Sequence, residues 1–256
     1  MFDSEDLLKT CPATVELHEW SLRLQLAAFY RVYHFNGWTD EIFNHITVRV
    51  SDGQFLINPF GLNYNEVTAR NLVKIDADGN VLDGSNWPVN RAGFVIHSAI
   101  HRARPDAHCV VHTHTTSGIA VACKENGLAF DNFYASFLYG RVAYHDFEGV
   151  TVRDDEQKRL VENLGDRSCL ILRNHGLLVA QTDIANAYYM MYVLQRACDV
   201  QVAAASIPGF NIPLTKEACE VSINEGKSTD PEGDLYNKVF EAAARRAGVT
   251  LASLLG

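Results

Sequence analysis

The chain has 256 residues, 47% of them hydrophobic and 21% charged, which is the balance of an ordinary soluble globular protein with a sizeable core. A net charge of -9 at pH 7, with lysines and arginines scattered through the sequence, argues against nucleic acid or an anionic membrane surface as the main partner. Residues 1–6 are acidic and no run of about 18 apolar residues occurs, so we expect neither export nor membrane insertion but a cytoplasmic protein.

The N-terminal part of the chain predicts one helix followed by a β-hairpin. Apolar residues recur at helical spacing from residue 14 to about residue 33. Two strand-like runs, residues 46–50 and 55–58, then flank a Ser-Asp-Gly-Gln turn. Asn44 and Asn58 collect at one end of this hairpin, where each either caps a turn or binds a ligand.

A second short hairpin is predicted over residues 73–75 and 80–82, on either side of an Asp-Ala-Asp-Gly turn. The segment from residue 94 to about residue 102 predicts a helix that ends before Arg-Pro-Asp. His97 and His101 are four residues apart and share one face of this helix. A pair at this spacing can bind zinc, but the first histidine has no adjacent glutamate, so the metalloprotease pattern H-E-x-x-H is absent.

The strongest functional signal is an apolar run, residues 109–111, that leads directly into His112, Thr113 and His114. On a strand, the period of two places both imidazoles on one face and Thr113 on the other, which is how a sheet presents two nitrogen ligands to one metal ion. His175 lies in a turn-type Asn-His-Gly between two further apolar runs. An unpartnered buried imidazole is costly, so the three histidines need a shared explanation. They would make an open metal site, with one coordination position free for water or substrate.

The sequence of the C-terminal half predicts three strands and two helices. Five elements are expected there, over residues 141–147, 154–164, 169–172, 177–180 and 183–205. Residues 206–256 are less constrained and contain a terminal helix over 235–247. We expect a single domain over residues 1–256, with 206–256 as a C-terminal extension. The six cysteines form no C-x-x-C pair, which indicates buried thiols in a reducing compartment.

In the order and spacing of these motifs, the chain resembles the class II aldolase/adducin family. The resemblance covers roughly residues 14–205 and is carried by Arg-Pro-Asp at 104–106, Val-His-Thr-His-Thr at 111–115, Asn-His-Gly at 174–176 and the long helix that follows. It implies an α/β fold of three α/β/α layers, with a central, mostly antiparallel mixed sheet between helices. It also implies a homo-oligomer, commonly a tetramer, whose sites lie near subunit boundaries and act on a small-molecule substrate.

The same resemblance implies a divalent metal, usually Zn²⁺, on His112, His114 and His175. In the family's aldolases the metal polarises a carbonyl and stabilises an enediolate, while a carboxylate acts as acid/base or completes the metal shell. That carboxylate belongs four residues before His97, where this chain has Gly93. Glycine cannot transfer a proton, so a base would have to come from His97, from a metal-bound hydroxide or from a neighbouring subunit.

The phosphate-binding pattern of the family's sugar-phosphate aldolases is largely replaced. The serine and threonine hydroxyls of that pattern are missing from the segments at 58–61 and 91–92, whereas Asn44 and Gly61 match it. We therefore expect a substrate other than a standard phosphorylated sugar, with Asn44, Asn58 and Arg91 lining its pocket.

Two functions are consistent with these residues. The first is a metal-dependent lyase that acts on a small hydroxy-carbonyl or hydroxy-acid substrate by retro-aldol cleavage or related enolate chemistry, with His97 as the candidate catalytic base. The alternative is a non-catalytic, adducin-like binding or assembly protein that keeps the fold. The three metal-type histidines favour the lyase, and the glycine at position 93 favours the binding protein. We favour the lyase.

Overall fold

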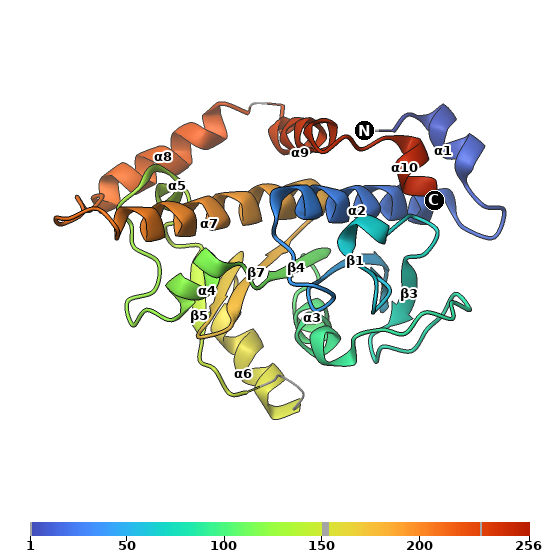
Figure 1. The fold of residues 1–256 in the computed structure, drawn as a ribbon, viewed down its shortest axis with the longest axis horizontal. Helices are drawn as coiled ribbons and strands as arrows, with labels where there is room; N and C mark the ends of the chain where they lie inside the picture. Colours follow the sequence, from blue (N-terminus) through green and yellow to red (C-terminus); the bar gives the residue numbers. More distant parts are fainter. Residues whose placement is uncertain (1, 150–153, 231) are drawn as a thin grey trace.

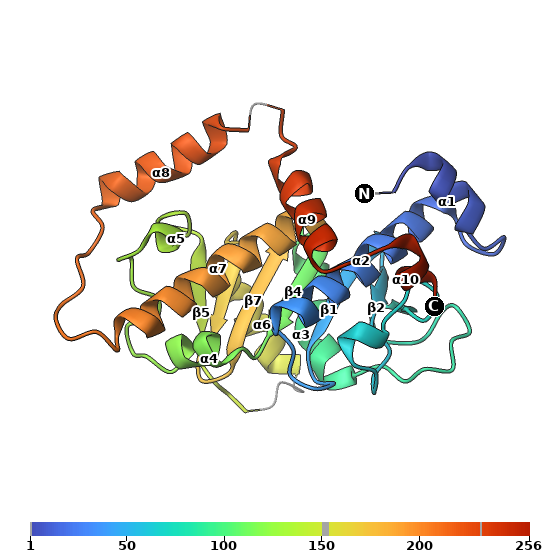
Figure 2. The same ribbon diagram turned by 45° about the horizontal axis from the view of Figure 1, so that its top comes forward.

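The computed structural model describes residues 2–149, 154–230 and 232–256, and within these the side chains of residues 91, 92, 154 and 227 are left out of the description. The described chain folds around a seven-stranded sheet (Figures 1 and 2). Its strands are β1 (His45–Ser51), β2 (Gln54–Ile57), β3 (Val73–Asp76), β4 (Cys109–Thr113), β5 (Val142–His145), β6 (Cys169–Leu172) and β7 (Gly176–Gln181). Their order is β3-β2-β1-β4-β7-β6-β5, and all neighbours are antiparallel except β5 and β6. The predicted mostly antiparallel mixed sheet is confirmed.

Helices cover both faces of the sheet, which confirms the three α/β/α layers (Figure 1). The long helices α2 (Leu17–Asn36) and α7 (Ile184–Ala204) lie along one face. Helices α3 (Arg91–Ala103) and α6 (Asp154–Leu164) lie on the other face. Helix α9 (Leu235–Arg246) packs on the outer side of α2 and α7, so residues far apart in the sequence share one apolar core.

The alternation of side chains along β4 places the histidines relative to these layers. Val111 belongs to the core beneath α2 and α7, whereas Val110 belongs to the core beneath α3 and α6. Successive strand residues point to opposite faces, so His112 points to the α3 side, as Val110 does. Thr113 points the other way, with its Oγ1 3.9 Å from the Met191 sulfur on α7. The prediction that His112 and Thr113 lie on opposite faces is confirmed.

The predicted long helix at 183–205 is present as α7, and Asp183 caps it by accepting a hydrogen bond from the Asn186 backbone N–H. Periodicity did not indicate several shorter helices. These are α1 (Ser4–Thr10), the 3-10 turn η1 (Tyr64–Glu66), α5 (Phe133–Ser136), α8 (Lys216–Ser228) and α10 (Leu251–Leu255). A short helix, α4 (Thr116–Ala122), follows β4. In the part of the chain that the structure describes, no helix is long and apolar enough to cross a membrane.

The second predicted hairpin is present in a short form. Residues 73–75 lie in β3, and the segment 80–82 meets it through an isolated bridge between Ile75 and Val81. Two backbone hydrogen bonds also join the segments, from Asp76 N–H to the Asn80 carbonyl oxygen at 3.0 Å and from Leu82 N–H to the Lys74 carbonyl oxygen at 2.8 Å. The Asp76 carboxylate also accepts backbone hydrogen bonds from Asp78 and Asn80, which holds the turn between the two segments.

Candidate metal centre and cavity

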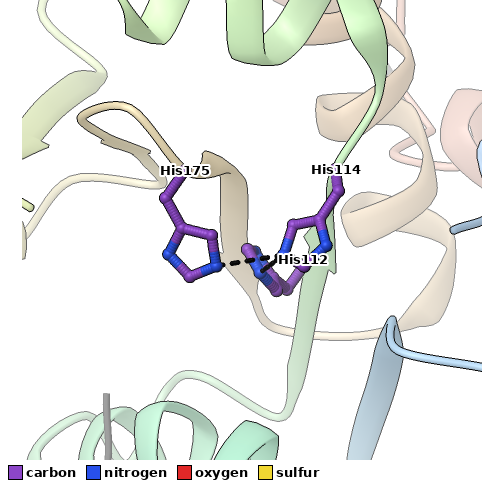
Figure 3. A group of neighbouring side chains, drawn as sticks. All are labelled: His112, His114 and His175. Atoms are coloured by element: carbon purple, nitrogen blue, oxygen red, sulfur yellow. Dashed lines mark hydrogen bonds between the residues drawn. The ribbon is translucent and has the colours of Figure 1, made fainter. Parts of the chain in front are cut away.

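Three imidazoles converge where β4 ends and the β6–β7 turn begins (Figure 3). The Nε2 atoms of His112 and His114 are 2.7 Å apart, and those of His114 and His175 are 3.0 Å apart. The three residues can offer ligand atoms that all lie within 4.8 Å of one another. The structure thus brings together the three histidines that the sequence singles out from two different strand ends.

The Asn-His-Gly turn explains how His175 reaches the other two histidines. Asn174 adopts a left-handed conformation with φ 58°, which asparagine tolerates better than most residues. A Cβ on Gly176 would lie 2.3 Å from the Thr113 carbonyl oxygen and 3.3 Å from Cε1 of His112. The turn therefore approaches β4 so closely that only glycine fits at position 176 without a shift of the backbone.

In His112 and His114, the hydrogen bond made by Nδ1 fixes the protonation state of Nε2. His112 Nδ1 donates to the Leu177 carbonyl oxygen at 2.9 Å, and His114 Nδ1 donates to the Asp40 carboxylate at 2.8 Å. A neutral imidazole carries one N–H, so both Nε2 atoms then carry lone pairs that face each other. Two lone pairs at 2.7 Å repel unless a proton or a cation lies between them. This donor set fits a divalent cation, because metal-bound histidines characteristically donate their outer N–H to a carbonyl or carboxylate.

Burial keeps the side chains of His112 and His175 neutral and therefore available as ligands. Burial lowers the pKa of His112 well below its usual 6.5, and the neighbouring His114 lowers it further. For His175, burial and the same neighbour lower the pKa to about 4. At neutral pH both rings present lone pairs, which is the form that binds metal.

The histidines open into a cavity of about 460 Å³. Its wall is lined by the three histidines together with Asp40, Phe43, His45, Phe60, Asn90, Gly93, Ile96, Phe147 and Gly149. Phe43 and Phe147 are each about half exposed, so they form an aromatic rim. No lysine or arginine is among the lining side chains that the structure describes. A cavity of this size and character suits a small molecule with an apolar part and a few polar groups.

Three of the other predicted site residues, His97, Asn44 and Asn58, do not line this cavity. His97 is fully buried, and its Nε2 is hydrogen bonded to His45 at 2.9 Å. The amide nitrogen and oxygen of Asn44 are buried and find no partner among the described residues. Asn58 accepts a hydrogen bond from the Tyr30 hydroxyl at 3.0 Å, so it has a role in the fold. Arg91 begins α3, but its side chain lies outside the described part of the chain.

Sequence reasoning missed His45, which lies at the cavity wall in front of His97. Its signal was present, because His45 and Thr47 share the β1 face toward α3, where His97 and His101 also share a face. Asp40 was missed as well. It lies 74 residues before His114, in a segment without regular structure, and no local pattern could have paired the two.

Residues 24–202 match the family model described as Class II Aldolase and Adducin N-terminal domain. A Pseudomonas aeruginosa protein, provisionally named an aldolase class 2 protein, is 48% identical over 195 residues, or 76% of this chain and 75% of that one. The alpha-adducin of Rattus norvegicus is 42% identical over 239 residues, which are 88% of this chain but only 32% of the adducin.

Among solved structures, an L-fuculose 1-phosphate aldolase from Glaciozyma antarctica superposes with a TM-score of 0.77. It is 30% identical to this chain, and the superposition covers 96% of this chain and 99% of that one. The similarity therefore extends beyond the sheet to almost the whole of both chains.

Proposed function

Because the chain belongs to the class II aldolase and adducin family, we propose that it is a metal-dependent lyase of class II aldolase type. It would cleave, or in reverse form, a carbon–carbon bond of a small hydroxy-carbonyl or hydroxy-acid substrate. The observation that carries the proposal is the set of three converging Nε2 atoms, two of which are held as facing lone pairs by Leu177 and Asp40.

His112, His114 and His175 would hold the metal, and Zn²⁺ is the ion that a site of three imidazoles suits best. When bound, the metal would supply Lewis-acid polarisation of a substrate carbonyl. Asp40 would orient the His114 ring through its 2.8 Å hydrogen bond. The three histidines line the cavity, so a substrate carbonyl that entered it would be beside the metal that they would hold.

The cavity wall limits the substrate. Phe43, Phe60 and Phe147 provide apolar surface, and the hydroxyls that hold a sugar phosphate in the resembling aldolases are replaced. We propose a substrate without a phosphate group, whose hydroxy-carbonyl end faces the histidines and whose other end packs against the aromatic rim. We also propose that the protein is a homo-oligomer, with four subunits as the family resemblance implies. We propose a cytoplasmic location for it.

The test is a screen of aldehydes with pyruvate or dihydroxyacetone as the donor, using protein loaded with Zn²⁺ and the same protein after treatment with a chelator. We expect new carbon–carbon bond formation in the loaded sample, its loss with the chelator and its loss in His112→Ala. An exposed-histidine variant, His18→Gln, is the control that keeps activity.

The adducin match supports one alternative, a binding or assembly protein that keeps the fold without turnover. Gly93 favours it, because the position carries no side chain that could transfer a proton. Protein that holds one Zn²⁺ per chain and yet turns over none of the donor and aldehyde pairs would favour this alternative.

A further inference from the structure

Four buried side chains form one continuous chain of hydrogen bonds behind the cavity. It starts at the Ala107 carbonyl oxygen, which lies 2.8 Å from His101 Nδ1. His101 Nε2 is 2.8 Å from Thr47 Oγ1, and this oxygen is 2.8 Å from His97 Nδ1. His97 Nε2 is in turn 2.9 Å from His45 Nδ1. All four side chains are at most 2% exposed, so water does not compete for these hydrogen bonds.

The carbonyl at one end fixes the direction of every hydrogen bond in this chain. A carbonyl oxygen only accepts, so His101 Nδ1 carries the proton and His101 Nε2 accepts from the Thr47 hydroxyl. The hydroxyl has a single proton, so its oxygen accepts from His97 Nδ1–H. His97 Nε2 then accepts from His45 Nδ1–H, and His45 Nε2 is left with a lone pair. Burial supports this neutral assignment, because it lowers the pKa of His45 and of His101 to about 3 and that of His97 well below 6.5.

Gly93 provides the space in which this lone pair lies. A Cβ at position 93 would be 1.9 Å from His45 Nε2 and 2.2 Å from its Cδ2. No side chain can therefore occupy position 93 while His45 keeps its place. Gly93 and His45 both line the cavity that contains His112, and the His45 and His112 rings are 5.7 Å apart. The His45 nitrogen thus takes the space into which a side chain at position 93 would extend.

We propose that His45 is the proton acceptor of this site and that His97, Thr47 and His101 are positioning residues that hold its tautomer. The proposal rests on the proposed lyase function. In a retro-aldol cleavage, the substrate hydroxyl gives its proton to His45 Nε2, and the O–H electron pair forms the new carbonyl. The electron pair of the broken carbon–carbon bond goes to the adjacent carbon, and the same proton returns to that carbon from Nε2. The step needs no oxidant, reductant or further reactant.

The tautomer can be tested on the metal-free protein by ¹⁵N NMR with labelled histidine, in which the His45 signals are those lost in His45→Ala. We expect His45 to be protonated on Nδ1 and bare on Nε2. Thr47→Val should disturb the His45 and His97 signals, and Thr47→Ser, which keeps the hydroxyl, should restore them. A His45 ring protonated on Nε2 in the wild-type protein would overturn the proposal.

Whether His45 occupies the space of a side chain at position 93 can be tested by thermal unfolding of the metal-free protein in a double-mutant cycle. Gly93→Ala alone should lower Tm by several degrees, because its Cβ displaces the His45 ring. In the His45→Ala background the same change should lower Tm little or raise it, since alanine is the better helix former. Equal shifts in the two backgrounds would show that His45 does not occupy this space.

The proton-transfer role is tested by exchange of donor carbon protons in D₂O, with dihydroxyacetone and pyruvate as probes and Zn²⁺-loaded protein. We expect His45→Ala to slow exchange by about 100-fold or more, as loss of a general base does. The double variant His45→Ala/Gly93→Glu places a carboxylate in the vacated space and should exchange at least tenfold faster than His45→Ala. His18→Gln, a change on the exposed side of α2, is the control that keeps the wild-type rate.

The outcomes separate the two proposals. Exchange that is metal-dependent in the wild type and persists in His45→Ala overturns the role of His45 and leaves the lyase function standing. No exchange of either probe in the wild type overturns the lyase function and the proton-acceptor role with it. Loss in His45→Ala with recovery in the double variant supports both.

Discussion

Asp40 offers the sharpest single-residue prediction about the metal centre. Its carboxylate accepts the His114 Nδ1 hydrogen bond at 2.8 Å, so it orients the ring and increases the electron density on Nε2. Removal of such a partner typically weakens metal binding by about 10–100-fold. The Asp40 side chain is 44% exposed, so water can replace part of its effect. We therefore expect Asp40→Ala to weaken Zn²⁺ binding by about tenfold, or about 1.4 kcal/mol.

The assay is a competition titration against a chromogenic chelator of known Zn²⁺ affinity. Asp40→Asn is the matched comparison, because its amide oxygen can still accept the hydrogen bond but carries no charge. We expect it to bind Zn²⁺ with an affinity between those of the wild type and Asp40→Ala. Asp52→Ala, in the exposed turn between β1 and β2, controls for the general loss of one negative charge. An Asp40→Ala protein whose Kd stays within twofold of the wild type would refute the role of this carboxylate.

Two further predictions concern stability. Gly176→Ala should lower the unfolding free energy by roughly 1–3 kcal/mol, because its Cβ would lie 2.3 Å from the Thr113 carbonyl oxygen. Thermal unfolding measures this loss. Gly226→Ala is the control that should lose no stability, because its Cβ would make ordinary contacts. The metal-free protein should lose stability as pH falls from about 6.5 toward 3, because burial lowers the pKa of His101 to about 3 while the unfolded chain binds the proton near 6.5. Each histidine with a pKa lowered in this way should reduce the unfolding free energy by roughly 1 kcal/mol between pH 6.5 and pH 5.5. Equal unfolding free energies from urea titrations at the two pH values would contradict this prediction.

Strand patterning made much of this site visible in the sequence. The period of two placed His112 and Thr113 on opposite faces, and the Asn-His-Gly turn indicated a second strand end that carries His175. These signals are local, because each depends on neighbours within a few residues. They were sufficient for most of the strands, the long helices α2 and α7, and the three candidate histidines, whereas the three-layer arrangement with a mostly antiparallel sheet was implied by the family resemblance.

The rest depends on contacts between distant segments. Asp40 reaches the site only because its loop folds against the end of β4, and no local pattern links it to His114. The strand period places His45 and Thr47 on one face, but only the pairing of β1 with β4 brings His45 beside His112. From the sequence, Gly93 indicated only that the family's acid/base carboxylate is missing at this position. The structure shows that the missing side chain also leaves space, and that the His45 ring occupies it. Helix α8 is largely exposed, with Cys219 as the one buried side chain among those described, so its sequence shows little apolar periodicity.

The central claim is that His112, His114 and His175 bind one divalent ion. The direct measurement is elemental analysis of the purified protein after dialysis against Zn²⁺ and removal of free ion. We predict close to one Zn²⁺ per chain in the wild type and loss of most of it in His112→Ala and in His175→Ala, while His18→Gln keeps the full amount. A wild-type protein without stoichiometric divalent metal, or variants that retain it in full, would contradict the account.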